Sequence, residues 1–174
     1  MFECVITDED LGYDSKGLYM PKIRIGARGI VKNKDGKIAI FNKQAKNEYK
    51  LPGGGVEDGE DIKETFIREV MEEAGCEVNN IIQIGIVEER KSFTNFKQIS
   101  YIFSCDVVND TKELRLTEKE AEEQARLLWL EPHEALKIMK ESFNNLKGSK
   151  YDDLYRTKFM SLRDRRVLEK YLGE

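Results

Sequence analysis

The stretch GGVEDGEDIKETFIREVMEEAGC, from Gly54 to Cys76, decides the fold and combines glycines with a high density of carboxylates. Nine acidic and two basic side chains lie between Glu57 and Glu77. This imbalance is unfavourable on an ordinary surface helix, because like charges four residues apart repel each other. The stretch therefore suggests a site where a ligand compensates the negative charge.

The second half of the stretch has the pattern of an amphipathic helix. Apolar residues recur every four positions from Ile62 to Ala74, which predicts one apolar stripe. Asp61 is a suitable N-cap residue, and Gly75 is well placed to end the helix. We therefore expect a helix over residues 62–74.

Three glutamates on this helix form a candidate metal site. Glu69, Glu72 and Glu73 are spaced i, i+3 and i+4, so they project from one side. Their repulsion is relieved by a hard divalent cation, and ligands made only of oxygen suit Mg²⁺ or Mn²⁺. The glycine loop Gly53–Gly55 lets the backbone approach closely and supplies carbonyl oxygens as further ligands.

An exposed acidic helix is the alternative interpretation, but here the glutamate spacing is tied to a glycine, an upstream Glu and an Arg. The spacing over 23 positions is Gly54-x5-Glu60-x7-Arg68-Glu69-Val70-x-Glu72-Glu73-x-Gly75-Cys76. This pattern resembles the Nudix box, GX5EX7REUXEEXGU, in which U is a bulky aliphatic residue. The single departure is Cys76 at the last U, a small apolar residue that concerns packing.

The order of elements favours an α/β fold with a mixed sheet flanked by helices. The resemblance implies a Nudix-type α/β/α sandwich over about residues 20–140. We expect an amphipathic helical extension over about 150–172, of one or two helices, and a single domain over 1–174. Strands are predicted at 2–7, 23–31, 37–41, 81–88, 98–108 and 127–130, helices at 62–74 and 132–140, and a polar connection at 90–97.

The resemblance also implies roles for the residues of the box. Glu69, Glu72 and Glu73 would bind the divalent metals, joined by the backbone carbonyl of Gly53, and Glu72 and Glu73 would be catalytic. The implied reaction is hydrolysis of a diphosphate bond in a nucleoside diphosphate linked to another group, by a metal-activated water. The residues expected to orient the box are Glu60 and Arg68.

The general base is left open between a box glutamate and one from a later acidic segment. That segment lies between the strands of Val107 and Trp129, and we favour Glu120 or Glu123 within it. The alternative for both residues is solvated charge.

Residues outside the box decide the substrate. Arg24 and Arg28 precede the box on a predicted strand and are candidates for a phosphate contact, and Phe93 is a candidate for stacking on a base. The basic residues of the C-terminal tail, Arg156 and Arg163 among them, are interpreted as the wet face of a helix, and a phosphate-binding or partner surface is the alternative. Members of the family that act on ADP-ribose carry a proline some fifteen residues after the box, where this chain has Lys91.

Two alternatives to this activity stay open at this point. One is a catalytically inactive Nudix-fold module that binds nucleotides and regulates. The other is a Nudix enzyme that removes oxidised nucleoside triphosphates. The complete set of box glutamates favours an active enzyme over the module.

Composition narrows the class of partner. The chain has 174 residues, a net charge of -4 and no apolar run of membrane-spanning length. The start of the sequence lacks the basic and apolar pattern of a signal peptide. We therefore expect a cytoplasmic protein with a small-molecule nucleotide substrate and no membrane or nucleic-acid partner, and a homodimer is left open.

Overall fold

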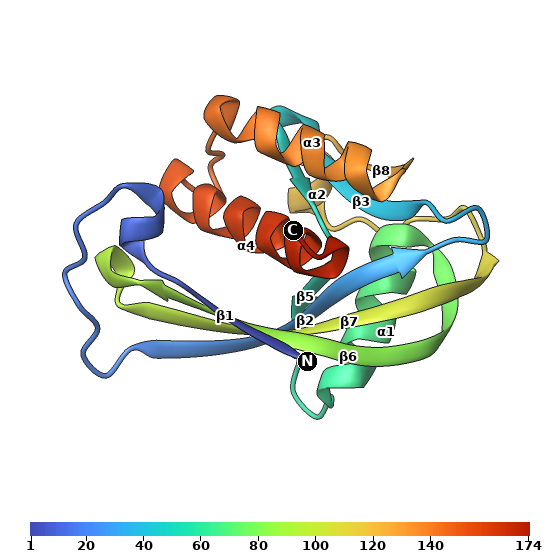
Figure 1. The fold of residues 1–174 in the computed structure, drawn as a ribbon, viewed down its shortest axis with the longest axis horizontal. Coiled ribbons are helices and arrows are strands. Elements are labelled where there is room, and N and C mark those ends of the chain that lie inside the picture. Colours follow the sequence, from blue (N-terminus) through green and yellow to red (C-terminus); the bar gives the residue numbers. More distant parts are fainter.

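The computed structural model describes residues 1–174 and is built around one mixed β-sheet (Figure 1). The strands follow the order β1-β6-β7-β2-β3-β4, with β5 paired to β2 and β8 paired to β3. The pairs β1–β6 and β2–β7 are parallel, and the other pairs are antiparallel. The strands are β1 (Phe2–Ile6), β2 (Lys22–Lys32), β3 (Ile38–Lys43), β4 (Glu48–Lys50), β5 (Gly53–Gly55), β6 (Cys76–Lys91), β7 (Phe96–Asp110) and β8 (Ala125–Leu130).

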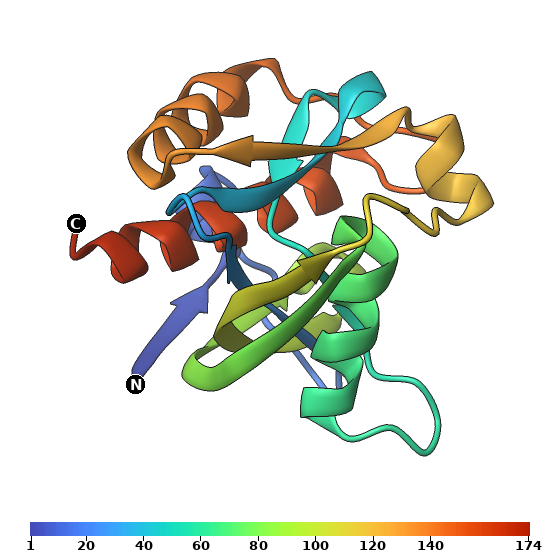
Figure 2. The same cartoon turned by 90° about the vertical axis from the view of Figure 1, so that its right-hand side faces the viewer.

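Helices cover both faces of this sheet, as Figures 1 and 2 show together. None of them has both the length and the apolar composition that a membrane-spanning helix requires. Four short 3₁₀ turns occur at Asp8–Leu11, Gln44–Lys46, Ser92–Thr94 and Phe143–Asn145. The helices are α1 (Ile62–Ala74), α2 (Glu118–Glu122), α3 (Pro132–Ser142) and α4 (Leu154–Leu172).

The alternation of side chains along β2 creates two cores, one on each face. Ile30 belongs to the core under α3 and α4, whereas the neighbouring Val31 belongs to the core under α1. In the α1 core, the rings of Phe66 and Phe103 stack with centroids 5.1 Å apart. This arrangement confirms the predicted α/β/α sandwich, and the departure from the box pattern, Cys76, is a buried member of the α1 core.

The ends of α1 form as the sequence predicts. The Asp61 carboxylate accepts a hydrogen bond from the Glu64 backbone N–H at 2.8 Å, and the Glu64 side chain accepts one from Asp61 N–H at 3.0 Å. This reciprocal cap typically contributes about 1 kcal/mol. Gly75 adopts a left-handed φ of 64° at the other end, which L side chains disfavour.

One local expectation is wrong and another is too broad. The glycine run is a strand, because Gly53–Gly55 pairs antiparallel with residues 26–28 of β2. The polar connection expected at 90–97 is shorter, since β6 reaches Lys91 and β7 begins at Phe96, so that only residues 92–95 connect the two strands. The ladder of backbone hydrogen bonds in this hairpin continues through residues whose side chains are polar, and the hydrophobic pattern does not report it.

The C-terminal segment forms one continuous helix, α4, which lies over the sheet (red in Figure 1). The helix is amphipathic as predicted, since Phe159 and Leu162 are buried against the core, but Leu154 at its start is 39% exposed. Two acidic contacts fasten the helix: Asp164 accepts the Leu51 N–H at 2.9 Å, and Glu89 on β6 accepts from Arg163 Nη1 at 3.0 Å.

The buried ion pair between Glu89 and Arg163 predicts a pH dependence of stability. Despite burial, the cations Lys91 and Arg163 hold the pKa of Glu89 at about 2, below its ordinary value of 4.5. A carboxyl with a lowered folded-state pKa stabilises the fold above its unfolded pKa, and this contribution is lost as the pH falls from about 5 to about 2. We expect Glu89→Gln to destabilise the protein by about 3–5 kcal/mol at pH 7.

Urea unfolding at a series of pH values measures this effect. The loss of stability between pH 5 and pH 2 should be smaller in Glu89→Gln than in the wild type. Glu3→Gln, at an exposed position of β1, is the matched control and should behave as wild type. Equal acid sensitivity of the wild type and Glu89→Gln would contradict the assignment.

Candidate active site

A cavity of about 260 Å³ brings the glutamate-rich helix and the C-terminal helix to one place. Figure 1 shows β5 between α1 and α4, and residues of all three elements line the cavity. The carboxylates of Glu69 and Glu73 lie on the α1 side. Arg156 and Arg163 lie on the α4 side, so the cavity has walls of opposite charge.

The glycine run is needed because site side chains press directly against its backbone. A Cβ atom on Gly54 would collide with the carboxylate of Glu69, and one on Gly53 would collide with the side chain of Arg28. The Gly53 N–H in turn donates to Glu73 Oε2 at 3.3 Å. The glycines therefore allow a strand, an arginine and a helix carboxylate to meet at one edge of the cavity.

Arg68 gathers the acidic groups of the box. Its Nη1 donates to Glu69 Oε1 at 2.8 Å and to Glu72 Oε2 at 3.3 Å. Its Nε and Nη2 donate to the carboxylate of Glu60, and Nη2 also reaches the Gly55 carbonyl oxygen at 3.2 Å. These hydrogen bonds lower the pKa of Glu60 to about 2. The geometry is that of a guanidinium which fixes the positions of three carboxylates.

Replacing Arg68 with lysine should therefore weaken the site without removing the charge. A lysine ammonium cannot match the planar fork that contacts three carboxylates and a carbonyl at once. We expect kcat/KM, or the affinity for the divalent cation, to fall about 10- to 100-fold. Steady-state kinetics with titrated Mg²⁺ measures both quantities, and a variant with unchanged values would show that Arg68 does not orient the box.

Glu73 is the most deeply buried box carboxylate. Burial raises its pKa, and the charges of Glu69 and Glu120 raise it further, whereas Lys50 opposes the shift. Burial also raises the pKa of Glu72, and the charge of Glu69 adds to that shift. A bound cation would stabilise the ionised form of each of these groups.

The box carboxylates do not surround a common point in this structure. Arg68 holds Glu69 and Glu72, the Gly53 N–H holds Glu73, and no group of three His, Cys, Asp or Glu side chains is arranged to bind a metal ion. Glu72 does not line the cavity. The donor set nevertheless fits Mg²⁺ or Mn²⁺ in chemistry, since it consists of carboxylates from one side of a rigid helix.

The two acidic residues favoured as general base lie in different surroundings. Glu120 on α2 lines the cavity that Glu69 and Glu73 line. Its Oε1 accepts a hydrogen bond from Thr117 Oγ1 at 2.8 Å, whereas its buried Oε2 has no partner. Glu123 instead forms buried ion pairs with two lysines and does not line the cavity. The structure therefore leaves only Glu120 of this pair in position to meet a substrate.

Of the three predicted substrate-binding residues, two line the cavity and one does not. Arg24 and Arg28 both line the cavity. Phe93 does not, because its ring stacks on Tyr155 with centroids 4.9 Å apart at the tip of the β6–β7 hairpin. Phe96 lines the cavity in its place.

Several residues of the cavity are not recognisable from the sequence, and Arg163 shows why. The sequence favours a wet helix face for the basic residues of the tail, but Arg163 is 2% exposed and lines the cavity. Arg163 follows Phe159 by four residues and therefore shares its buried stripe, which is a usable signal. Lys50, Lys91 and Gln98 also line the cavity, and the sequence gives no comparable sign of them.

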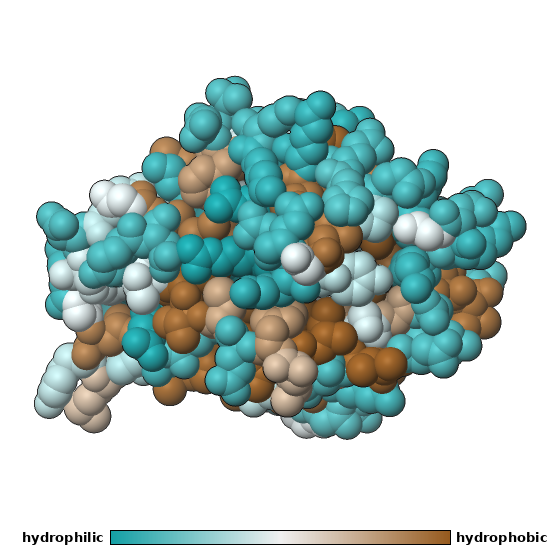
Figure 3. All heavy atoms as spheres, viewed as in Figure 1, coloured by the Kyte–Doolittle hydropathy of each residue, from teal (hydrophilic) through white to brown (hydrophobic).

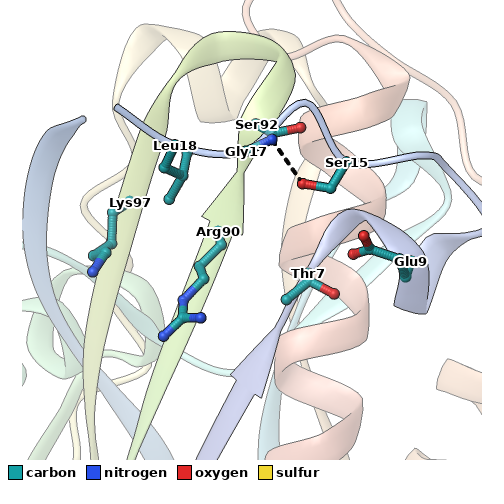
Figure 4. Close-up of a pocket in the computed structure, with 8 residues that line it drawn as sticks. All are labelled: Thr7, Glu9, Ser15, Gly17, Leu18, Arg90, Ser92 and Lys97. Carbon is teal, nitrogen blue, oxygen red and sulfur yellow. Dashed lines mark hydrogen bonds between the residues drawn. The ribbon is translucent and has the colours of Figure 1, made fainter. Parts of the chain in front are cut away.

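A second cavity, of about 400 Å³, is lined by Arg90, Ser92 and Lys97 at the turn of the β6–β7 hairpin and by residues from the N-terminal segment (Figure 4). It is larger, but its two cations are engaged, since Arg90 and Lys97 bind Glu88 Oε1 at 2.6 and 3.2 Å. None of the box residues reaches it. We therefore place the candidate active site in the smaller cavity.

This fold and site define a protein of the Nudix class. The NUDIX domain family model matches residues 22–150, so the chain belongs to that family. The chain is 32% identical over 101 residues to the ADP-ribose pyrophosphatase of Methanocaldococcus jannaschii, which covers 56% of the chain. The chain spans 59% of the length of that relative.

Solved structures show the same fold at lower identity. A NUDIX hydrolase from Nitrosomonas europaea matches with a TM-score of 0.62 at 17% identity and covers 87% of this chain and 90% of its own. A Nudix hydrolase family member from Chromobacterium violaceum matches with a TM-score of 0.52 at 19% identity, and the match covers 87% of this chain and 78% of that chain. A MutT protein from Bacillus halodurans matches with a TM-score of 0.53 at 24% identity, and the match covers 66% of this chain and 72% of that chain.

Proposed function

We propose that the protein is a divalent-metal-dependent pyrophosphohydrolase. It cleaves the diphosphate bond of a nucleoside diphosphate linked to another group, by attack of water on phosphorus. The observation that supports this most strongly is the cavity with Glu69, Glu73 and Glu120 on one side and buried cations on the other. Family membership supports the same reaction class.

The roles of the box residues follow from their chemistry. Glu69, Glu72, Glu73 and the Gly53 carbonyl would hold Mg²⁺ or Mn²⁺, which stabilises charge on the phosphoryl oxygens and lowers the pKa of a bound water. The register of β2 with β5 agrees with the carbonyl assignment. Gly29 N–H donates to Pro52 O, and Val56 N–H donates to Ile25 O, so the alternation along the strand turns the N–H and the C=O of Gly53 away from β2.

Other residues of the chain bind and activate the reactants. The Lys50 side chain is buried and lines the cavity, and its ammonium forms no hydrogen bond or ion pair with the protein, so it is available to a phosphate oxygen of the substrate. Glu120 Oε2 is likewise without a partner and would accept the proton of the attacking water. Phe96 offers a ring for stacking on a base.

ADP-ribose is the first substrate to test, because the relative at 32% identity is an ADP-ribose pyrophosphatase. Oxidised nucleoside triphosphates are the second candidate, favoured by the number of cations that line the cavity. We further propose a cytoplasmic protein that acts on free nucleotides.

The test is a panel of substrates with Mg²⁺ or Mn²⁺ and separation of the nucleotide products. It includes ADP-ribose, other nucleoside diphosphate derivatives, and oxidised and ordinary triphosphates. We expect at least one compound to yield a nucleoside monophosphate in a metal-dependent manner. No turnover of any compound, together with tight metal-independent nucleotide binding, would instead identify an inactive binding module.

A further inference from the structure

The end of the cavity beside α4 contains three buried cations, which we call the α4-end cluster: Arg28 on β2, Lys91 at the end of β6 and Arg163 on α4. They are 5%, 5% and 2% exposed. Arg163 lies beyond residues 22–150, the part of the chain that the family match covers, whereas Arg28 and Lys91 lie within it. The cluster therefore combines two cations of the matched domain with one from the C-terminal helix.

The cluster carries more positive charge than its own partners neutralise. Glu89 lies 3.2 Å from Lys91 Nζ and 3.0 Å from Arg163 Nη1. Asp164 lies 2.7 Å from Arg163 Nε, but its distance to Arg28 Nη1 is 3.8 Å, too long for a hydrogen bond. Three cations thus share two carboxylates, and burial together with the charge of Arg163 lowers the pKa of Arg28. Excess buried charge is costly unless a counterion binds.

The same cluster contains hydrogen-bond donors without acceptors. Nε and Nη1 of Arg28 and Nη2 of Arg163 are buried and bond to no protein atom. Buried donors in folded proteins nearly always have a partner. Two guanidinium groups with free N–H donors are suited to a phosphate group, which accepts several charge-assisted hydrogen bonds at once.

No box carboxylate forms an ion pair with a cation of the cluster, whose acidic partners are Glu89 and Asp164. Arg68 and the Gly53 N–H hold the box carboxylates instead. The free donors of the cluster are therefore not used by the groups proposed to bind the metal ion, and they are available to a further anionic group.

We propose that the α4-end cluster binds an additional phosphate group of the substrate, beyond the diphosphate that is cleaved. This inference rests on the proposed function and predicts a preference for nucleotides with at least three phosphate groups over ADP-ribose, which has two. The additional group is either the third phosphate of a nucleoside triphosphate or a phosphate ester on the moiety linked to the nucleoside diphosphate.

Calorimetric titration of the full chain in Mg²⁺ tests the proposal with methylene-bridged analogues, which resist cleavage of the bridged bond. One pair is the analogues of ADP and ATP. The other is the analogues of ADP-ribose with and without a phosphate on the distal ribose. We expect the additional phosphate to improve Kd by about 10- to 100-fold in at least one pair, and the pair that responds identifies the source.

Variants locate the effect. In the analogue pair that responds, Arg28→Gln should bring the ratio of the two Kd values close to one. Arg28→Lys retains the charge and should therefore give a ratio between that of Arg28→Gln and that of the wild type. Arg165→Gln removes a positive charge from α4 outside the cavity and should leave the ratio at its wild-type value. Melting temperatures confirm that each variant is folded.

A wild-type ratio near one in both pairs, or a ratio that survives Arg28→Gln, would overturn the proposal. These outcomes are separable from failure of the proposed function. Absence of the additional-phosphate effect in the wild type, with ADP-ribose still hydrolysed, refutes the cluster alone. Absence of hydrolysis with the binding ratio intact refutes the enzyme activity alone.

Discussion

Glu73→Gln is expected to lower kcat/KM by at least about 100-fold while the protein remains folded. The Glu73 side chain is buried, lines the cavity and accepts a hydrogen bond from Gly53 N–H. Glutamine has the same shape and keeps an oxygen for that bond, but it removes the negative charge proposed to hold the divalent cation. The loss should therefore appear in kinetics and not in the far-UV circular dichroism spectrum.

Glu64→Gln is the matched control, since it makes the same chemical change on the same helix. Glu64 occupies the third helical position, where glutamine can also complete the N-terminal cap. We expect its activity to stay within about twofold of wild type, because it removes an exposed charge and preserves the cap. Wild-type turnover in Glu73→Gln would refute the assignment of Glu73 as a metal ligand.

Removal of divalent cations is expected to abolish hydrolysis. Dialysis against a chelator should reduce turnover at least about 100-fold, and Mg²⁺ or Mn²⁺ should restore it. A second readout does not depend on turnover. A cation that binds only the folded state stabilises it by about 2.7 kcal/mol at 100 times its Kd, so Mg²⁺ should raise the melting temperature.

Glu72→Gln tests whether that stabilisation comes from the box. The increase in melting temperature caused by Mg²⁺ should be smaller in this variant than in the wild type. The same titration on Glu113→Gln, an exposed position outside the helix, should reproduce the wild-type increase. Full activity in the chelated wild-type protein would exclude a metal-dependent reaction.

The parts of the site that the sequence predicts are those determined by local structure. Helix α1, its cap at Asp61 and the contacts of Arg68 all lie within the Gly54–Cys76 stretch, where a 3.6-residue period fixes which side chains share a face. The fold class follows from the same stretch, because its pattern is specific to one family.

The parts that the sequence does not predict depend on tertiary packing. The burial of Arg163 depends on the docking of α4 over the sheet and on Glu89, 74 residues away in the chain. Phe93 and Phe96 are equivalent aromatic candidates in the sequence, and only the turn at Ser92–Thr94 decides which one lines the cavity. Such long-range pairings leave no periodic pattern.

The hydrogen bond from Leu51 N–H to Asp164 has a consequence for the order of folding. It joins residues 113 positions apart, directly before the glycine strand, whereas the caps of α1 join residues three or four positions apart. Closing so long a loop costs entropy before any contact compensates it, so short-range structure tends to form earlier. During refolding, helical signal from α1 should therefore precede the ability to bind nucleotide, and the site is completed only when α4 docks.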